Sequence, residues 1–142
     1  LGITVLTSMD NEALAQVGIS RTAAEQVDLL ANVAKESGIS GVVASPQEAS
    51  MLRKILGPDA YIVTPGVRPK GSDKGDQSRI ATPAEAFAAG ASHIVIGRPI
   101  TQADDPAAAF DAIAAELAHD AAGVDGGLGT GGGGGCTDAS QR

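Results

Sequence analysis

The stretch Gly41-Val42-Val43-Ala44-Ser45-Pro46-Gln47-Glu48 combines a β-strand with the start of a helix. Residues 41–44 are short, apolar and partly β-branched, which is typical of a buried strand. Ser45 is a good helix N-cap, Pro46 suits the first helical position, and Glu48 stands three residues after the hydroxyl, which is the spacing of a capping box. The stretch therefore predicts a strand that passes directly into a helix.

The same order of strand and helix repeats on both sides of this stretch. Further strands are predicted at residues 3–6, 61–64 and 93–96. Helix starts are predicted at Asp10, Thr22, Thr82 and Asp105, and helix ends at Gly38, Gly57 and Gly90. Apolar residues at helical spacing predict two buried faces, Val27-Leu30-Ala31-Ala34 and Phe110-Ile113-Ala114-Leu117. Strands that alternate with helices pair in parallel, so the predicted fold class is α/β with four parallel strands, covered on both faces.

The composition and net charge limit the classes of partner that the protein is expected to bind. The chain has 142 residues, a formal net charge of -7, and a hydrophobic fraction of 43% with two Phe, one Tyr and no Trp. A net negative chain has no general attraction for nucleic acid or for anionic lipid, so we expect neither as a partner. No apolar run approaches the ~20 residues of a membrane span. A single cysteine, Cys136, excludes an internal disulfide and favours a cytoplasmic location.

The ends of the last two predicted strands carry the residues best suited to bind an anion. Arg68 follows strand 61–64 through Pro65 and Gly66, which form a rigid turn. Gly97 and Arg98 follow strand 93–96, and a glycine amide beside a guanidinium suits phosphate oxygens. These positions correspond to the phosphate site of parallel barrels. The sequence therefore predicts an anion site at these strand ends.

Other residues leave alternatives open. Arg68 or Arg98 alone is more often a surface ion-pair residue. Thr7, after the first strand, either binds a ligand or caps the helix that starts near Asp10. Gln77 lies late in a long connection, residues 65–81, and is placed to fold over a ligand as a lid. His93 has no second ligand at metal spacing, so we predict no metal site.

Several motifs in this order resemble the C-terminal half of the orotidine 5'-phosphate decarboxylase family, of the bacterial type. The motifs are Leu6-Thr7-Ser8-Met9, Gly41-Val42-Val43-Ala44-Ser45, Thr64-Pro65-Gly66-Val67-Arg68-Pro69, Gly75-Asp76-Gln77, Arg79-Ile80-Ala81-Thr82-Pro83 and Val95-Ile96-Gly97-Arg98-Pro99-Ile100-Thr101. The resemblance covers residues 1 to about 117. It implies one half of a (β/α)8 TIM barrel, in an enzyme that is a homodimer and converts orotidine 5'-phosphate to UMP and CO2 without metal or cofactor.

The resemblance also implies roles for individual residues. Arg68, Gly97 and Arg98 would hold the 5'-phosphate. Gln77 would bridge the phosphate and the pyrimidine from a closing loop, Thr7 would contact the base, and Pro65 would line the carboxylate region. These roles are carried over motif by motif.

The family's catalytic array resembles Asp-x-Lys-x-x-Asp on an earlier strand, and no such motif occurs in the chain. We therefore expect the array upstream of Leu1, and no catalytic residue within the chain. Without the array we expect the isolated chain to be inactive, because phosphate binding alone does not accelerate the reaction. Four strands alone leave two sheet edges unpaired, so we also expect the chain to be unstable or to self-associate. Two alternatives remain, a noncatalytic phosphate-binding half-barrel and part of a related decarboxylase or synthase of sugar phosphates.

Two regions are predicted from the change in composition. Residues 1–119 form the half-barrel, and residues 120–142 form a disordered glycine-rich tail. A glycine pattern at 127–132 resembles a dinucleotide-binding loop, but it has no strand before it and no helix after it, so we reject that interpretation.

Overall fold

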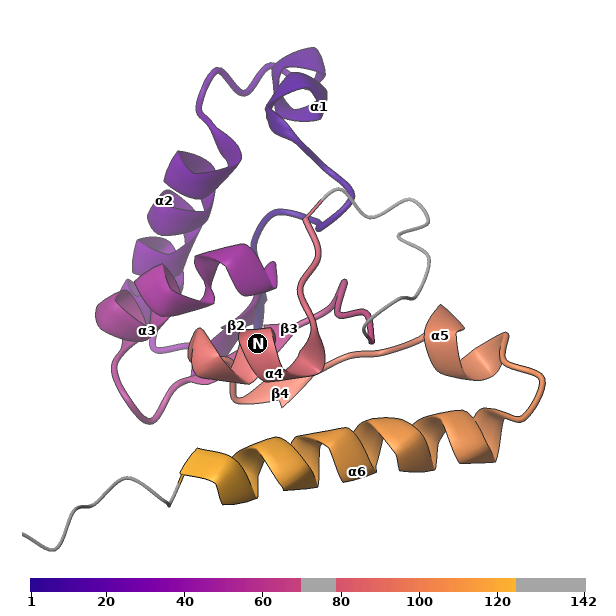
Figure 1. The fold of residues 1–142 in the computed structure, drawn as a ribbon. Coiled ribbons are helices and arrows are strands. Elements are labelled where there is room, and N and C mark those ends of the chain that lie inside the picture. Colours follow the sequence, from indigo (N-terminus) through magenta and orange to yellow (C-terminus); the bar gives the residue numbers. More distant parts are fainter. Residues whose placement is uncertain (70–78, 125–142) are drawn as a thin grey trace, which may run out of the picture.

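The structure is a computed structural model that describes residues 1–69 and 79–124, with side chains as far as residue 118 (Figure 1). The strands are β1 (Gly2–Ile3), β2 (Gly41–Val43), β3 (Tyr61–Thr64) and β4 (His93–Ile94). The helices are α1 (Asn11–Gln16), α2 (Ala23–Glu36), the 3-10 turn η1 (Pro46–Glu48), α3 (Ala49–Leu56), α4 (Pro83–Ala88), α5 (Arg98–Thr101) and α6 (Pro106–Val124).

The four strands form one parallel sheet in the order β1-β2-β3-β4, which confirms the predicted fold class. The two outer strands are shorter than predicted. β1 ends at Ile3 and β4 at Ile94, although Val95 N still donates to Thr64 O at 2.9 Å. Each outer strand has a neighbour on one side only, so its ladder loses pairing sooner than that of a central strand.

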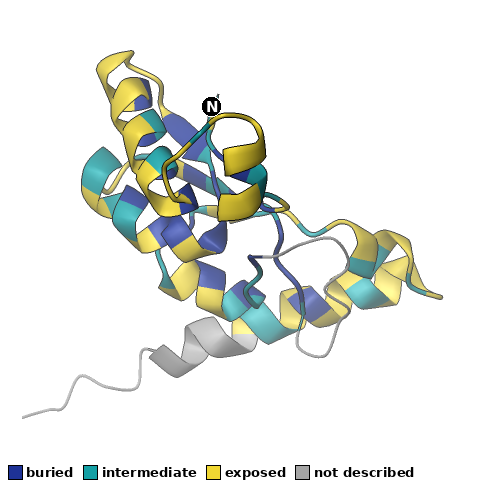
Figure 2. Ribbon diagram, turned by 90° about the horizontal axis from the view of Figure 1, so that it is seen from above, coloured by how far each residue is buried: buried dark blue, intermediate teal, exposed yellow. Residues whose placement is uncertain are grey.

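The two faces of the sheet differ. Helices α2 and α3 pack on one face, where Val42 and Ile62 are fully buried (Figures 1 and 2). The strand register places a row of residues on the other face, namely Ile3, Val43, Val63 and His93. Ile3 is 63% exposed there, and no described element covers it. The expectation that both faces are covered is therefore wrong for the described residues. One covered face and one open face are what the wall of an incomplete barrel would have.

Local capping explains where most helices begin. Thr22 and Thr82 both form the predicted capping box, each with a Glu carboxylate that accepts from the cap's backbone N–H at 2.8 Å. The predicted box at Ser45 does not form. Ser45 Oγ accepts from Gln47 N at 3.3 Å, and a 3-10 turn precedes α3. Gly38, Gly57 and Gly90 follow their helices with positive φ, as predicted.

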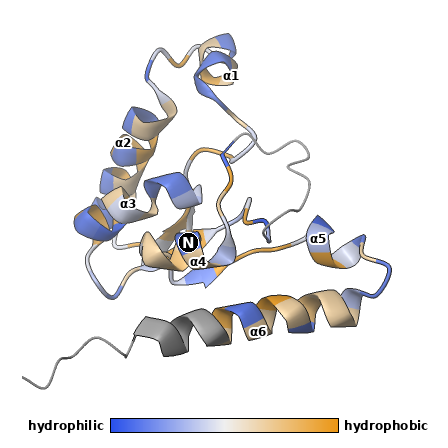
Figure 3. Cartoon of the chain, viewed as in Figure 1, coloured by the Kyte–Doolittle hydropathy of each residue, from blue (hydrophilic) through white to orange (hydrophobic). Residues whose placement is uncertain are grey.

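The C-terminal elements depart from prediction in three ways. Residues 98–101 form α5, which the sequence analysis did not anticipate. α6 continues to Val124, past the predicted boundary at residue 119, and residues 125–142 lie outside the described part. On α6, Ile113 is buried, but Phe110 is 58% exposed. This strongly apolar helix contacts α4 and α5 (Figure 3). On its predicted buried face, Ala114 is exposed as well, and Leu117 is half-buried.

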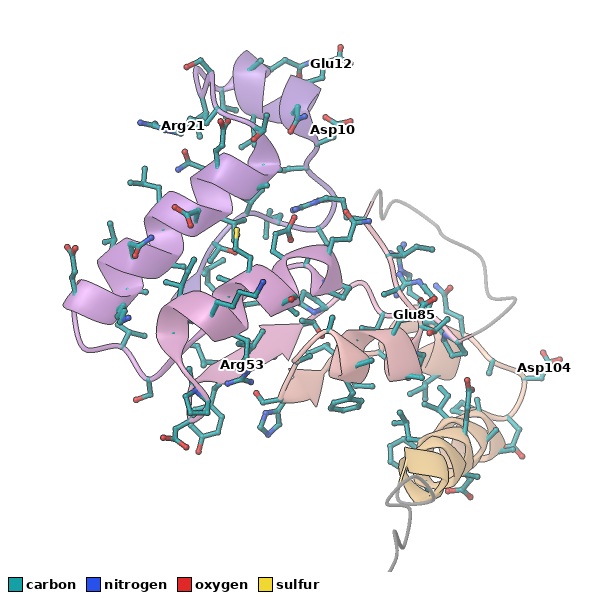
Figure 4. All side chains as sticks on the ribbon, turned by 60° about the vertical axis from the view of Figure 1, so that its left-hand side comes forward. Asp10, Glu12, Arg21, Arg53, Glu85 and Asp104 are labelled. Carbon is teal, nitrogen blue, oxygen red and sulfur yellow. The ribbon has the colours of Figure 1, made fainter. Side chains whose placement is uncertain are left out.

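Arg53 fastens the opposite end of the sheet from the candidate site (Figure 4). Its Nη1 donates to the carbonyls of Gly57, Pro58 and Ala60 at 3.0, 2.8 and 2.8 Å. Nε and Nη2 donate to Gly90 O at 3.2 and 2.8 Å. One guanidinium thus joins the loop before β3 to the loop before β4.

We expect Arg53→Met to lower the free energy of unfolding by about 2 to 3 kcal/mol, because charge-assisted hydrogen bonds are lost and carbonyl groups lose their partner. Urea unfolding at one fixed protein concentration measures the change. Lys54→Met is the matched control on the next, exposed residue, and it should stay within about 0.5 kcal/mol of the unaltered chain.

Candidate phosphate-binding site

Buried polar residues gather at the carboxyl ends of the strands. They are Thr7, Ser45, Glu48, Thr64, Arg68 and Arg79. Thr7 follows β1, Ser45 and Glu48 follow β2, and Thr64 ends β3. In parallel α/β proteins this edge of the sheet is where ligands bind.

Arg68 is held at this edge by its backbone. Gly66 adopts a φ of +78°, which forms the tight turn after β3. Arg68 N donates to Ala81 O at 2.9 Å, and Val67 forms a parallel bridge with the same residue. The side chain of Arg68 is 7% exposed, and its Nη1 donates to Val67 O at 3.0 Å. The surrounding turn therefore fixes Arg68, as the prolines and glycine of its motif predicted.

Arg68 and Arg98 follow the carboxyl ends of the neighbouring strands β3 and β4. Thr64 pairs with Ile94, and each arginine stands four residues beyond its member of that pair. Arg98 is exposed at the start of α5, with Gly97 as the residue before the helix. A Cβ added to Gly97 would meet no atom of the described residues within 4 Å, so these residues leave open space beside its backbone. That both guanidiniums reach one anion stays a prediction.

The structure describes two of the three other predicted site residues, Thr7 and Pro65. Thr7 is 6% exposed at the end of β1. Asp10 caps α1, since its Oδ1 accepts from Ala13 N at 2.9 Å, so the alternative that Thr7 caps this helix is wrong. Pro65 is half-buried directly after β3. Gln77 lies outside the described residues, and its role as a lid stays a prediction.

Sequence reasoning assigned no role in the candidate site to two charged residues that the structure buries here. Arg79 Nη1 forms an ion pair with Glu48 Oε1, and their side chains are 10% and 7% exposed. Arg79 stands in one of the motifs quoted above, and Glu48 was interpreted as a capping residue. The two residues are 31 positions apart in the sequence, so no local pattern reveals the pairing.

The described part of the chain has no cluster of metal ligands, and one of its hollows lies away from the strand ends. No group of three or more His, Cys, Asp or Glu side chains is placed there to hold a metal ion. His93 is exposed, with its ring 5.7 Å from that of Tyr61. A hollow of about 520 Å³ lies on the outer side of α2, lined in part by Arg21, Leu29 and Met51. Across residues 1–69 and 79–124, no helix has the length and apolar character that a bilayer span requires.

Residues 1–113 match the profile of the family described as "Orotidine 5'-phosphate decarboxylase / HUMPS family". The chain belongs to this family. Its similarity to orotidine 5'-phosphate decarboxylases is high, at 59% identity over 118 residues with the protein of that name from Moorella thermoacetica and 56% over 115 residues with the one from Thermobifida fusca. These matches cover 82% and 81% of the chain, but 47% and 49% of the relatives.

Solved structures agree with the family assignment. The crystal structure of orotidine 5'-phosphate decarboxylase from Lactobacillus acidophilus matches with a TM-score of 0.65 and 43% identity, over 81% of this chain and 47% of that one. The enzyme from Pyrococcus horikoshii matches with a TM-score of 0.55 and 29% identity, over 71% and 46%. The chain therefore has the fold of part of an orotidine 5'-phosphate decarboxylase TIM barrel and spans about half the length of these relatives.

Proposed function

We propose that this chain supplies the phosphate-binding half of an orotidine 5'-phosphate decarboxylase barrel. The observation that carries the proposal is that Arg68 and Arg98 follow the carboxyl ends of neighbouring strands β3 and β4, each four residues along the chain from the paired residues Thr64 and Ile94. Gly97 adds a backbone position with open space beside it. A dianionic phosphate suits two guanidiniums and a nearby glycine amide. The similarity to relatives of that name supports orotidine 5'-phosphate as the ligand.

The chemistry is divided between the two halves of the barrel in this proposal. Decarboxylation breaks the bond between C6 and the carboxylate, releases CO2 and leaves an electron pair on C6, which then takes a proton. The Asp-x-Lys-x-x-Asp motif that would destabilise the carboxylate and donate the proton does not occur in these 142 residues. The proposed contribution of the chain is to bind and orient the substrate. Arg68, Gly97 and Arg98 would hold the phosphate, and Gln77 would bridge the phosphate and the pyrimidine. Thr7 would contact the base, and Pro65 would line the carboxylate region.

A joined barrel tests this proposal. It consists of the part of the Moorella thermoacetica relative that precedes its match to this chain, followed by residues 1–142. We expect this protein to convert orotidine 5'-phosphate to UMP, measured by the loss of substrate absorbance and by released CO2. A folded joined barrel without turnover would contradict the proposal, provided that the intact relative, prepared in parallel, is active.

The second candidate is a phosphate-binding half-barrel without catalytic function. The buried polar edge favours it as much as the first candidate, because binding alone needs no Asp/Lys array. It predicts a joined barrel that binds UMP without turnover. A third candidate, a sugar-phosphate decarboxylase or synthase, predicts no turnover of orotidine 5'-phosphate and no affinity for UMP. The homodimer, the cytoplasmic location and the absence of a cofactor stay predictions.

Gly97→Ala probes the space beside the proposed phosphate. The new Cβ meets no atom within 4 Å, so we expect unfolding in urea to be unchanged. A methyl group at a filled phosphate site costs about 1 to 3 kcal/mol, so we expect the KM for orotidine 5'-phosphate in the joined barrel to rise about tenfold or more. An unchanged KM would show that the ligand does not approach Gly97.

A further inference from the structure

The ion pair between Arg79 and Glu48 links the segments that follow two strands, β1 and β2. Arg79 Nη2 donates to Leu6 O at 3.0 Å and to Val5 O at 3.4 Å, just before Thr7. Its own carbonyl accepts from Ser45 Oγ at 3.4 Å, after β2. Through Glu48, the guanidinium is also fastened to η1.

The same segment fixes Arg68. Two residues beyond Arg79, Ala81 O accepts from Arg68 N at 2.9 Å, and Ala81 forms the bridge with Val67. Arg79 is therefore connected to both Thr7 and Arg68. Its guanidinium donates to the carbonyls of Val5 and Leu6, just before Thr7, and Ala81, two residues after Arg79, accepts from the backbone N–H of Arg68. Arg79 thus has contacts near both of the proposed ligand-binding positions, through its guanidinium on one side and through the backbone of its segment on the other.

Stability alone is a poor explanation for this pair. Glu48 Oε2 and Arg79 Nε are buried and have no hydrogen-bond partner among the described residues. Burying two charges is costly, and apolar residues of similar size often stabilise a protein as well or better. Glu48 also stands at a capping-box position, yet its carboxylate binds Arg79 while the other two boxes form. Neither helix capping nor burial therefore explains why Glu48 and Arg79 are paired at this place.

We propose that Arg79 and Glu48 are positioning residues, which hold Thr7 and Arg68 at the spacing that a nucleoside monophosphate requires. This inference rests on the proposed function, and it assigns to the pair a specific part in substrate binding. Neither residue needs to touch the ligand. A shift of about 1 Å in a positioned group is enough to reduce binding and turnover strongly.

Two variants of the joined barrel separate positioning from structure. Arg79→Met with Glu48→Leu replaces both charges by apolar side chains, so we expect the urea midpoint to be kept or raised. Arg79→Lys keeps the charge but loses the forked geometry that reaches Glu48 and Leu6 together. We expect both variants to raise the Kd of UMP, measured by calorimetry, roughly tenfold or more. We expect KM to rise with it, and kcat to change less.

Lys35→Met is the matched structural control, because Lys35 Nζ donates to Ile55 O at 2.6 Å between α2 and α3, away from the strand ends. It should lower the urea midpoint and leave the Kd of UMP unchanged. Wild-type Kd in the folded double variant would overturn the positioning role while the turnover of the unaltered joined barrel still supports the proposed function. An unaltered joined barrel that binds no UMP would overturn both.

Discussion

The 142-residue chain alone should release CO2 from orotidine 5'-phosphate no faster than buffer does. Within the proposal, the chain binds the phosphate, but it contains no Asp-x-Lys-x-x-Asp motif to act on the carboxylate or to protonate C6. Phosphate binding that is equally strong in substrate and transition state does not speed the chemical step. Adding the separately prepared N-terminal half of the Moorella thermoacetica relative should restore turnover, measured as released CO2.

The physical basis for this complementation is the open face of the sheet. β1 and β4 each have one unpaired edge, and the row formed by Ile3, Val43, Val63 and His93 has no cover among the described residues. Without the other half, we expect self-association that sedimentation detects and that added N-terminal half reverses. Turnover by the chain alone would contradict the proposed division of chemistry. If the mixture shows no turnover while the joined barrel is active, the two separate halves do not assemble into a barrel.

Arg98→Ala in the joined barrel should lower kcat/KM for orotidine 5'-phosphate about 10- to 150-fold, because a hydrogen bond between charged groups contributes about 1.5 to 3 kcal/mol. Arg98 is exposed at the start of α5, so the fold should tolerate its loss. Initial rates over a range of substrate concentrations measure the effect, and urea unfolding checks the fold.

Arg21→Ala is the matched control for charge. Arg21 is also exposed, but it lies before α2, beside the hollow on the outer surface. Its removal changes the net charge by the same amount and should leave kcat/KM within about twofold, because exposed charges far apart are screened by salt. Equal losses of kcat/KM in the two variants would mean that Arg98 acts through the overall electrostatic field of the protein and not through contact with the phosphate.

The sequence predicted most of the framework because its signals are local. Apolar runs of four residues located all four strands, and a hydroxyl with Glu three residues later located α2 and α4. The positive φ of Gly66 follows from its place in the turn before Arg68. Arg68 and Arg98 could be placed at one edge of the sheet because parallel strands end on the same side.

Features that depend on distant partners escaped prediction. Glu48 has the spacing of a capping residue, and only the folded chain shows that its carboxylate forms an ion pair with Arg79 instead. The helical face around Phe110 was predicted as buried because periodicity shows which residues share a face, not whether another element covers it. α5 has four residues and begins at Arg98-Pro99, so it is too short for any periodic signal.

Competitive inhibition by UMP and by uridine, compared in the joined barrel, tests most directly whether Arg68 and Arg98 hold one phosphate. The two ligands differ only by that group. Arg68→Met and Arg98→Ala should each raise the Ki of UMP at least about tenfold and leave the Ki of uridine unchanged. An unchanged Ki of UMP in both variants, or an equal rise for uridine, would contradict the phosphate assignment.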